Sequence, residues 1–210
     1  MDTATNIFFK NEFVEQYDDL VKKQKWYGVE VLFGMMFEFL NQNDVILDVG
    51  IGTGLSAENF HATGMEVYGL DYSDEMLEMC KQKNITVDLK QFDLTNSPLP
   101  YNSDFFDHIS ANAVLYFIEN LDELFSEIQR ILKTNGVWAF IIEEHNKNDI
   151  DIIEKPKAKN GLVNYSHSQK YVSNLISENK FTILKKLEFV AENFQMQGKS
   201  VTFVAYICRG

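Results

Sequence analysis

An apolar run that ends in closely spaced glycines constrains this chain more than any other feature. Residues 45–49, VILDV, are too few for a helix and nearly all apolar, so they predict a strand buried on both faces, as in a parallel sheet. Gly50, Gly52 and Gly54 follow at once, and a helical pattern begins after them. Glycines at this spacing allow a tight turn and the close approach of a ligand, while the first N–H groups of the helix favour a polar or anionic group. The stretch therefore predicts a nucleotide-type site between a strand and a helix.

Two carboxylates fall beside this turn. Asp48 stands at the carboxyl end of the first strand, where it can accept hydrogen bonds from the loop or from a ligand ammonium. Asp71 ends the next apolar run, residues 65–70, and a carboxylate in that place can accept hydrogen bonds from both hydroxyls of a ribose. Because Leu55 stands near the last glycine position of the dinucleotide fingerprint, the spacing here departs from that fingerprint. An ordinary glycine turn with an incidental acid is the alternative interpretation.

A third strand is predicted over residues 86–92, and its end also suits a ligand. Phe92, Asp93 and Leu94 come at this end. The Asp93 carboxylate can accept a hydrogen bond from a nucleobase amine, and Leu94 can offer a backbone N–H and an apolar face. The alternative for Asp93 is a simple turn residue.

A fourth strand is predicted over residues 105–110. Ala111 and Asn112 follow its carboxyl end, where small side chains leave room for a ligand. His108 lies inside the strand, away from that end, so we interpret it as structural despite the usefulness of histidine as a base.

Helical patterns alternate with these strands. The clearest covers residues 121–132, with Asn120 and Glu123 as a predicted capping pair and Asn135–Gly136 as the predicted end; we expect it to be scaffold. This alternation predicts a doubly wound α/β domain with helices on both faces of a mostly parallel sheet and an antiparallel hairpin at one edge. The other predicted helices are 56–63, 74–83 and 167–179, and the remaining strands are 137–142, 182–190 and 201–207, the last two forming the hairpin around a turn at 195–199.

Residues 144–165 break the pattern with a polar, irregular segment. Lys147, Lys155, Lys157 and Lys159 make it the one basic feature of an acidic chain. Long irregular insertions are usually functional or disordered, so we expect either a substrate-side loop or a solvated flexible one.

Residues 1–41 are predicted to be helical and to pack on the main domain, which covers residues 42–210. The whole chain is thus expected to form one compact unit. The apolar residues that set the helical spacing are Phe9, Phe13, Tyr17, Val31, Met35 and Phe39.

The composition excludes several classes of protein. The chain has 210 residues and a net charge of −12, which disfavours nucleic acid and polyanionic substrates. Cys80 and Cys208 are too far apart to suggest a metal or redox motif, so no metal site is expected and the thiols suit the cytoplasm. Charged residues interrupt the N-terminal segment and no apolar run reaches membrane-spanning length, so neither a signal peptide nor a membrane segment is expected.

Two motifs carry a resemblance to a known family, the class I S-adenosylmethionine-dependent methyltransferases. LDVGIGTG resembles their first motif, with Ile51 where many members carry cysteine. VYGLDYSDEML resembles their second, with the acidic residue at Asp71 and Tyr72 after it. The resemblance covers nearly the whole chain. YDDLVKKQKWYGVEV and NYSHSQKYVSNLISENKF are similar to a bacterial subgroup of small-molecule methyltransferases, some attached to tetratricopeptide repeats, although no such repeat is visible here.

The resemblance implies a seven-stranded Rossmann-like sheet and an enzyme of class EC 2.1.1.-. S-adenosylmethionine would be the cofactor, S-adenosylhomocysteine the product, and an oxygen, nitrogen or carbon of a small molecule the methyl acceptor. N-terminal helices would cover the cofactor cleft, with Tyr17 and Tyr27 near the ligand. Together with the strand-end positions above, the cofactor-binding residues are expected to be Tyr27, Asp48, Gly50, Ile51, Gly52, Gly54, Asp71, Tyr72, Met76, Phe92, Asp93, Leu94, Ala111 and Asn112.

The sequence does not select a catalytic residue. A sulfonium is already a strong electrophile, so the protein mainly aligns the acceptor and excludes water. A hydroxyl acceptor would also need a base, and Tyr116, Glu143, His145 and His167 are all candidates. The protein is expected to be a monomer or a weak homodimer. The rival hypotheses are a non-catalytic methyltransferase-like binding module or partner subunit, and a dinucleotide-dependent oxidoreductase using NAD or NADP.

Overall fold

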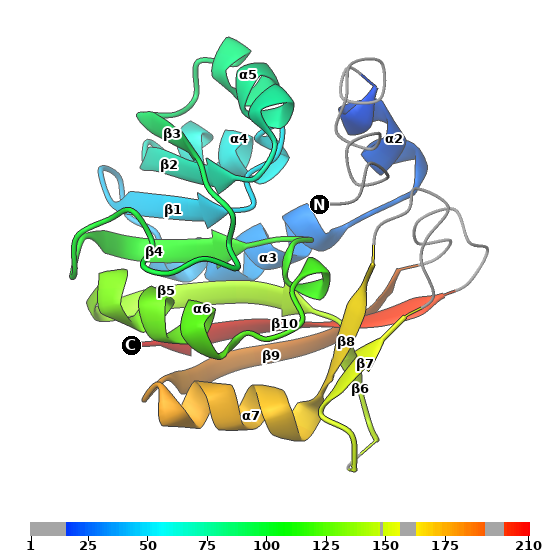
Figure 1. Ribbon diagram of the computed structural model, residues 1–210. Coiled ribbons are helices and arrows are strands. Elements are labelled where there is room, and N and C mark those ends of the chain that lie inside the picture. Colours follow the sequence, from blue (N-terminus) through cyan, green and yellow to red (C-terminus); the bar gives the residue numbers. More distant parts are fainter. Residues whose placement is uncertain (1–15, 148, 156–162, 192–199) are drawn as a thin grey trace.

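The computed structural model of the protein describes residues 16–147, 149–155, 163–191 and 200–210 (Figure 1). Among these residues, no helix combines the length and the apolar character needed to cross a membrane. The elements in chain order are α2 (Tyr17–Lys23), α3 (Gly28–Met36), the 3₁₀ helix η1 (Phe37–Phe39), β1 (Val45–Val49), α4 (Leu55–Ala62), β2 (Glu66–Asp71), α5 (Asp74–Gln82), β3 (Asp88–Gln91), β4 (Phe106–Ala111), the 3₁₀ helix η2 (Leu115–Phe117), α6 (Asp122–Ile131), β5 (Leu132–Ile142), β6 (Glu144–His145), β7 (Ile152–Glu154), β8 (Tyr165–Ser168), α7 (Gln169–Glu178), β9 (Thr182–Ala191) and β10 (Val201–Arg209).

Seven strands form one mixed sheet in the order β3-β2-β1-β4-β5-β10-β9. Strands β1 to β5 run parallel, and β10 runs antiparallel to both β5 and β9. The predicted Rossmann-like sheet with an antiparallel C-terminal hairpin at one edge is therefore confirmed. Strand β1 lies between β2 and β4, which explains why four of its five residues are buried.

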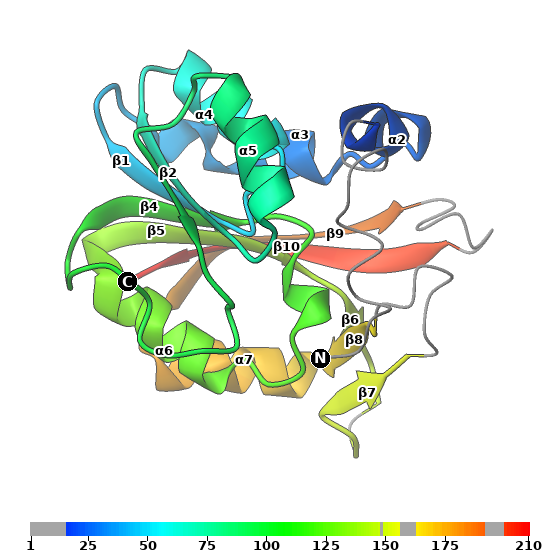
Figure 2. The same cartoon turned by 45° about the horizontal axis from the view of Figure 1, so that its top comes forward.

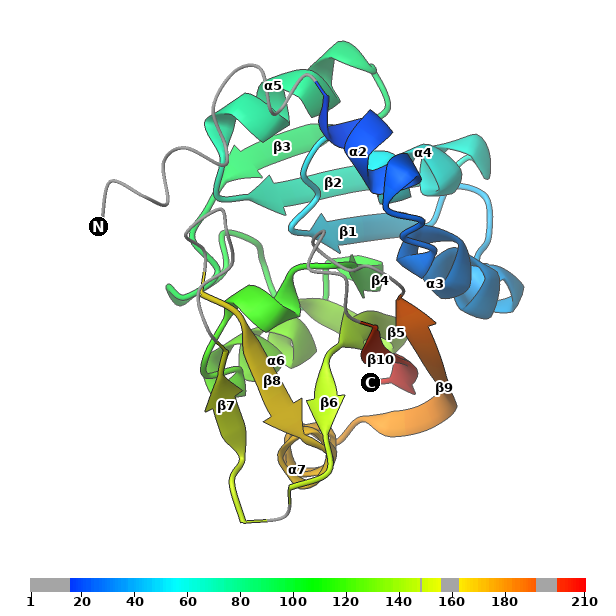
Figure 3. The same cartoon turned by 90° about the vertical axis from the view of Figure 1, so that its right-hand side faces the viewer.

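Helices cover both faces of this sheet (Figure 2). On one face α6 and α7 pack over a core that includes Phe125, Trp138 and Phe140. On the other face α3, α4 and α5 pack over a core that includes Met36 and Phe60. Viewed from the side of Figure 3, α2 and the small sheet of β6, β7 and β8 lie at the edge where β1 and β4 end. This carboxyl edge is where open α/β sheets bind ligands.

Helix α6 ends earlier than predicted. It stops at Ile131, and Leu132 is already extended and pairs with Phe106 in the sheet. The predicted end at Asn135–Gly136 is wrong, because the sheet register with β4 overrides the local glycine signal. The start also differs in part, since the Asn120 side chain accepts a hydrogen bond from the Asp122 N–H over 2.9 Å. Leu121 is the N-cap residue, and its side chain makes no capping bond.

The polar segment after β5 contains regular structure. In the described part of residues 144–165, β6 and β7 pair with β8 in a separate three-stranded sheet, with the order β6-β8-β7. The expectation of an irregular loop is therefore wrong there, because the short apolar pair Ile152 and Ile153 was too weak a signal against its polar neighbours. His167 belongs to β8, and helix α7 begins after Ser168, whose hydroxyl accepts the Tyr171 N–H.

Several expectations fall outside the described residues. They concern the N-terminal helical spacing at Phe9 and Phe13, the loop lysines Lys157 and Lys159, and the turn at 195–199.

The glycines offer a test of packing. Gly54 has φ +87°, and a Cβ there would stand 2.8 Å from the Cys80 Sγ. Gly54→Ala is expected to lower the free energy of unfolding by about 1–3 kcal/mol, measured by urea denaturation. Gly34 in α3 is the matched control, since no described atom lies within 4 Å of its Cβ position. Gly34→Ala should raise that free energy by about 0.5–1 kcal/mol. Equal effects of the two substitutions would contradict this account.

Candidate functional site at the carboxyl edge

The three glycines of the turn between β1 and α4 have different surroundings. All three have positive φ, at +71°, +55° and +87° for Gly50, Gly52 and Gly54. A Cβ at Gly50 would collide with Val114, and one at Gly54 with Cys80. At Gly52, by contrast, no described atom lies within 4 Å of the Cβ position. Two of the glycines therefore permit close packing, and Gly52 faces open space where a ligand can approach.

Asp71 ties the glycine turn to the end of β2. Its Oδ2 accepts the Gly52 N–H over 2.8 Å, and its Oδ1 accepts the Ser73 N–H over 2.9 Å. Burial raises the pKa of Asp71, and these backbone donors partly oppose that effect. The carboxylate thus lies beside the predicted ligand loop and keeps lone pairs for further donors.

Asp48 is buried at the end of β1, with 1% of its surface exposed. Its Oδ1 accepts the Ser110 hydroxyl over 2.8 Å, whereas its Oδ2 has no hydrogen-bond partner among the described residues. Burial, together with the negative charge of Asp71, raises the pKa of Asp48 to about 7. A buried carboxylate oxygen without a donor is costly, and it is a natural partner for a cationic ligand group.

Asn112, just beyond β4, connects two elements around the site. Its Oδ1 accepts the indole N–H of Trp26 over 3.3 Å, and its Nδ2 donates to the Ser56 hydroxyl over 3.1 Å. The structure thus brings Trp26 to the predicted site, and sequence reasoning missed this residue. Its neighbour Tyr27, which we predicted, is 57% exposed. The only sequence signal was the aromatic pair Trp26–Tyr27 before α3. This pair does not indicate which of the two rings faces inward.

Helix α2 is bonded directly to the glycine turn. The Asp18 carboxylate accepts the Thr53 hydroxyl over 2.5 Å and the Lys83 ammonium over 2.9 Å. Burial raises the pKa of Tyr17 to about 12, with the charges of Asp71 and Asp18 contributing. Tyr17 therefore lies in the electrostatic field of the carboxylate that was predicted to hold a ribose.

Three other predicted residues have buried side chains: Ile51, Met76 and Ala111. Ile51 packs in the core, and a Cβ at Gly69 would stand 2.5 Å from it. The Ile51 N–H donates to the Leu70 carbonyl over 2.9 Å. Met76 lies in the first turn of α5, where its N–H donates to the Ser73 hydroxyl. The expected cofactor contacts of these residues stay predictions.

The remaining predicted residues lie on the loops that follow β2 and β3. Tyr72 is 45% exposed, and its carbonyl accepts the Gln91 side chain. Phe92 and Leu94 pack against the core of the α6 face. The Asp93 Oδ1 accepts both the N–H and the hydroxyl of Thr95, so Asp93 does form a turn. Its assignment to a nucleobase stays a prediction.

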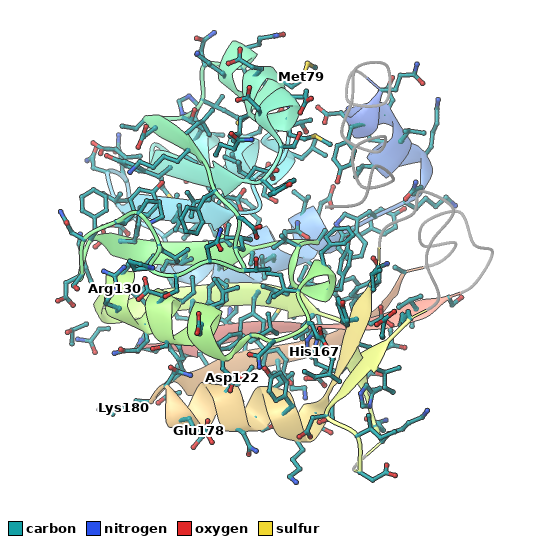
Figure 4. All side chains as sticks on the ribbon, in the orientation of Figure 1. Met79, Asp122, Arg130, His167, Glu178 and Lys180 are labelled. Atoms are coloured by element: carbon teal, nitrogen blue, oxygen red, sulfur yellow. The ribbon has the colours of Figure 1, made fainter. Side chains whose placement is uncertain are left out.

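The four candidate bases have different surroundings. Burial raises the pKa of Tyr116 well above its usual value, which makes it a poor base near neutral pH. His167 belongs to β8 of the small sheet (Figure 4), and its Nε2 bonds the carbonyl of Glu119, just before α6, over 2.9 Å. Burial lowers the pKa of both His145 and His167. Glu143 directly follows β5, is 6% exposed and forms an ion pair with Lys155.

No group of three or more potential ligands for a metal ion occurs among the residues that the structure describes.

The sequence and the fold of this site are similar to those of known proteins. A methyltransferase-domain family matches residues 47–140, which run from β1 through the glycine turn into β5. The same seven-stranded fold occurs in a S-adenosylmethionine-dependent methyltransferase from Methanosarcina mazei, with a TM-score of 0.70 and 16% identity over 85% of this chain and 97% of that one. Residues 47–140 thus match the methyltransferase-domain family, and the fold is that of class I S-adenosylmethionine-dependent methyltransferases. S-adenosylmethionine is the cofactor of that family.

Two sequence relatives show how far the similarity extends. A demethylmenaquinone methyltransferase of Tropheryma whipplei (strain Twist) is 36% identical over 96 residues, 43% of this chain. The match spans only 38% of that relative's length. A carboxy-S-adenosyl-L-methionine synthase of Yersinia pseudotuberculosis serotype IB is 27% identical over an alignment 228 positions long. This alignment covers 96% of this chain and 92% of that protein. The narrower resemblance to tetratricopeptide-associated members stays a prediction.

The raised pKa of Asp48 predicts a pH-dependent stability. Between about pH 4 and pH 7 the unfolded chain ionises this carboxyl while the folded protein keeps it protonated, so its effect on stability grows more unfavourable as the pH rises. Asp48→Asn should therefore stabilise the ligand-free protein more at pH 8 than at pH 5, by about 2–3 kcal/mol. Urea denaturation at both pH values measures this difference. Asp104→Asn, at an exposed position with positive φ, is the control. The same gain for Asp48→Asn at both pH values would contradict the argument.

Proposed function

We propose that this protein binds S-adenosylmethionine at the carboxyl edge of β1, β2 and β4 and transfers its methyl group to a small molecule. The observation that carries the proposal is the buried Oδ2 of Asp48, which has no donor among the described residues and lies beside a turn with open space at Gly52. A cofactor with an ammonium group and a sulfonium offers the positive charge that this oxygen lacks.

Each part of the cofactor has a candidate partner. The Asp71 carboxylate accepts hydrogen bonds from the ribose hydroxyls. The glycine at position 52 lets the cofactor approach the protein backbone closely. Asp93 and Leu94 take the adenine at the end of β3. Asp48 and the space beside Asn112 take the methionine portion. These assignments follow the family resemblance and fit the positions of the side chains.

The N-terminal helices act as a lid in this proposal. Asp18 holds α2 on the glycine turn through Thr53 and Lys83, and Trp26 reaches Asn112 on the other side. In this proposal the described part of residues 1–41 is a covering segment of the main domain at 42–210. Closing them over the cofactor excludes water, which protects the sulfonium and favours direct methyl transfer.

Carboxyl transfer is a second candidate, because the relative aligned over 96% of this chain is a carboxy-S-adenosyl-L-methionine synthase. A carboxylate formed on the cofactor would need a cation to bind it. Among the described residues near this edge, Lys155 is paired with Glu143, and Lys83 with Asp18 and Glu58. Methyl transfer is therefore the better supported chemistry. Mass spectrometry separates the two reactions, since one yields S-adenosylhomocysteine and the other a nucleoside heavier by one carboxyl group.

Calorimetric titration with S-adenosylmethionine, S-adenosylhomocysteine and NAD tests the cofactor. Micromolar binding of the first two without binding of NAD is expected. Binding of NAD alone would contradict the proposal, and binding of none would favour a non-catalytic module.

Asp71→Asn tests the ribose assignment. It keeps the size of the side chain but removes its charge, so the affinity for S-adenosylmethionine should fall by about 2–3 kcal/mol in the same calorimeter. Asp88→Asn, at the exposed edge of β3, is the matched control and should bind as the wild type does. An unchanged dissociation constant in Asp71→Asn would remove Asp71 from the site.

A further inference from the structure

A partly buried ion pair, Lys155–Glu143, and a cluster of aromatic rings lie at the carboxyl edge, next to the cofactor site of the proposed function. Strands β5 and β10 pair so that Ala205 faces Ile141 and Val204 faces Ile142. Continuing this register places Phe203 opposite Glu143, just beyond the end of β5. Residues opposite each other in an antiparallel pair point to the same face, so this extension of the register puts Glu143 on the face of Phe203, which also carries α3 and α4.

The rings around Phe203 come from three separate parts of the chain. Its ring centroid lies 5.0 Å from that of Trp26, 6.0 Å from that of Tyr116 and 6.0 Å from that of Phe189. Trp26 also lies 5.9 Å from Phe189. The covering segment, the 3₁₀ helix η2 and the C-terminal hairpin thus meet in one aromatic cluster, formed by Trp26, Tyr116, Phe189 and Phe203.

This cluster touches the proposed cofactor site on one side. The Trp26 indole N–H donates to Asn112, and Asn112 follows β4 where the methionine portion of the cofactor is placed. On the other side stands Glu143, which is 6% exposed and bonded to Lys155. A molecule held between the rings and Glu143 would therefore lie next to the methyl group.

The chemistry of these groups selects a class of acceptor. Aromatic side chains favour a planar ring, which they contact by faces and edges. A buried carboxylate favours a hydrogen-bond donor. The charge of Lys155 is already balanced by Glu143, and the chain as a whole carries a net charge of −12, so an anionic acceptor is disfavoured.

We infer that the methyl acceptor is a planar aromatic molecule with a hydroxyl or amine hydrogen, bound among Trp26, Tyr116, Phe189 and Phe203 and oriented by Glu143. This inference rests on the proposed function. The acceptor donates its O–H or N–H to Glu143, and the oxygen or nitrogen attacks the methyl carbon. As the new bond to carbon forms, the carbon–sulfur bond breaks and the sulfur keeps the electron pair. The proton passes to the Glu143 carboxylate, which Lys155 holds in place.

Ligand-observed NMR of the protein saturated with S-adenosylhomocysteine tests this site. The probes are naphthol, naphthylamine, naphthoate and decahydronaphthol, which vary the ring and the polar group separately. Naphthol and naphthylamine should bind at least about tenfold more tightly than the other two, because only they combine a planar ring with a neutral donor.

Variants assign the interaction to particular residues. Glu143→Gln should weaken naphthol binding by about tenfold or more, and Trp26→Leu should weaken both aromatic probes. Glu154→Gln removes a charge from an exposed position next to Lys155 and should change neither. Calorimetry with S-adenosylhomocysteine shows whether each variant is folded and retains the cofactor site, which the Glu143 variant should bind as the wild type does.

The outcomes separate the two proposals. If S-adenosylhomocysteine does not bind to the wild-type protein, the proposed function fails, and this inference with it. If S-adenosylhomocysteine binds but naphthoate or decahydronaphthol is preferred, or no probe binds, the inference alone is overturned. Unchanged naphthol affinity in Glu143→Gln would also overturn it.

Discussion

The site depends on two carboxylates, Asp48 and Asp71, held near each other at the carboxyl ends of β1 and β2. Neither charge is neutralised by a lysine or arginine in the hydrogen bonds that the structure shows. Burial of Asp48, with a smaller contribution from the negative charge of Asp71, raises the pKa of Asp48 to about 7. A positively charged ligand relieves both effects at once, so binding it would stabilise the fold. The ligand-free protein thus carries an electrostatic cost that a cationic ligand would remove.

Polar contacts of moderate strength hold α2 and Trp26 at the site. Asp18 is partly exposed where it bonds Thr53 and Lys83, and the bond from Trp26 to Asn112 is 3.3 Å long. Partly exposed polar contacts contribute little to stability and break at low cost. Helix α3, which also lies within residues 1–41, is instead anchored by the fully buried Leu32 and Met36. In the proposed lid, α2 is therefore the part that would open for cofactor exchange.

Fold and chemistry have to be kept apart in this family. The relative that aligns over nearly the whole chain is a synthase of carboxy-S-adenosyl-L-methionine, so a shared sheet does not fix the reaction. The reaction is decided by what surrounds the methyl group. In the proposed site those surroundings would be aromatic rings and a carboxylate paired with Lys155, which would favour an acceptor that is flat, neutral and able to donate a hydrogen bond.

The sequence by itself determined the sheet and the glycine turn, because both rest on local signals. Val45–Val49 is too apolar and too short for anything but a buried strand, and positive φ at Gly50, Gly52 and Gly54 admits little else than glycine. The assignments of Asp48 and Asp71 to that edge followed from their places after strands. Only the tertiary structure decided the small sheet within 144–168, the early end of α6, and the choice of Trp26 rather than Tyr27 as the ring that faces inward. These features depend on pairing and packing between segments far apart in the chain, which no local pattern encodes. The inferred proximity of Glu143 to Phe203 is of the same kind, since it extends the register of two strands separated by about sixty residues of sequence.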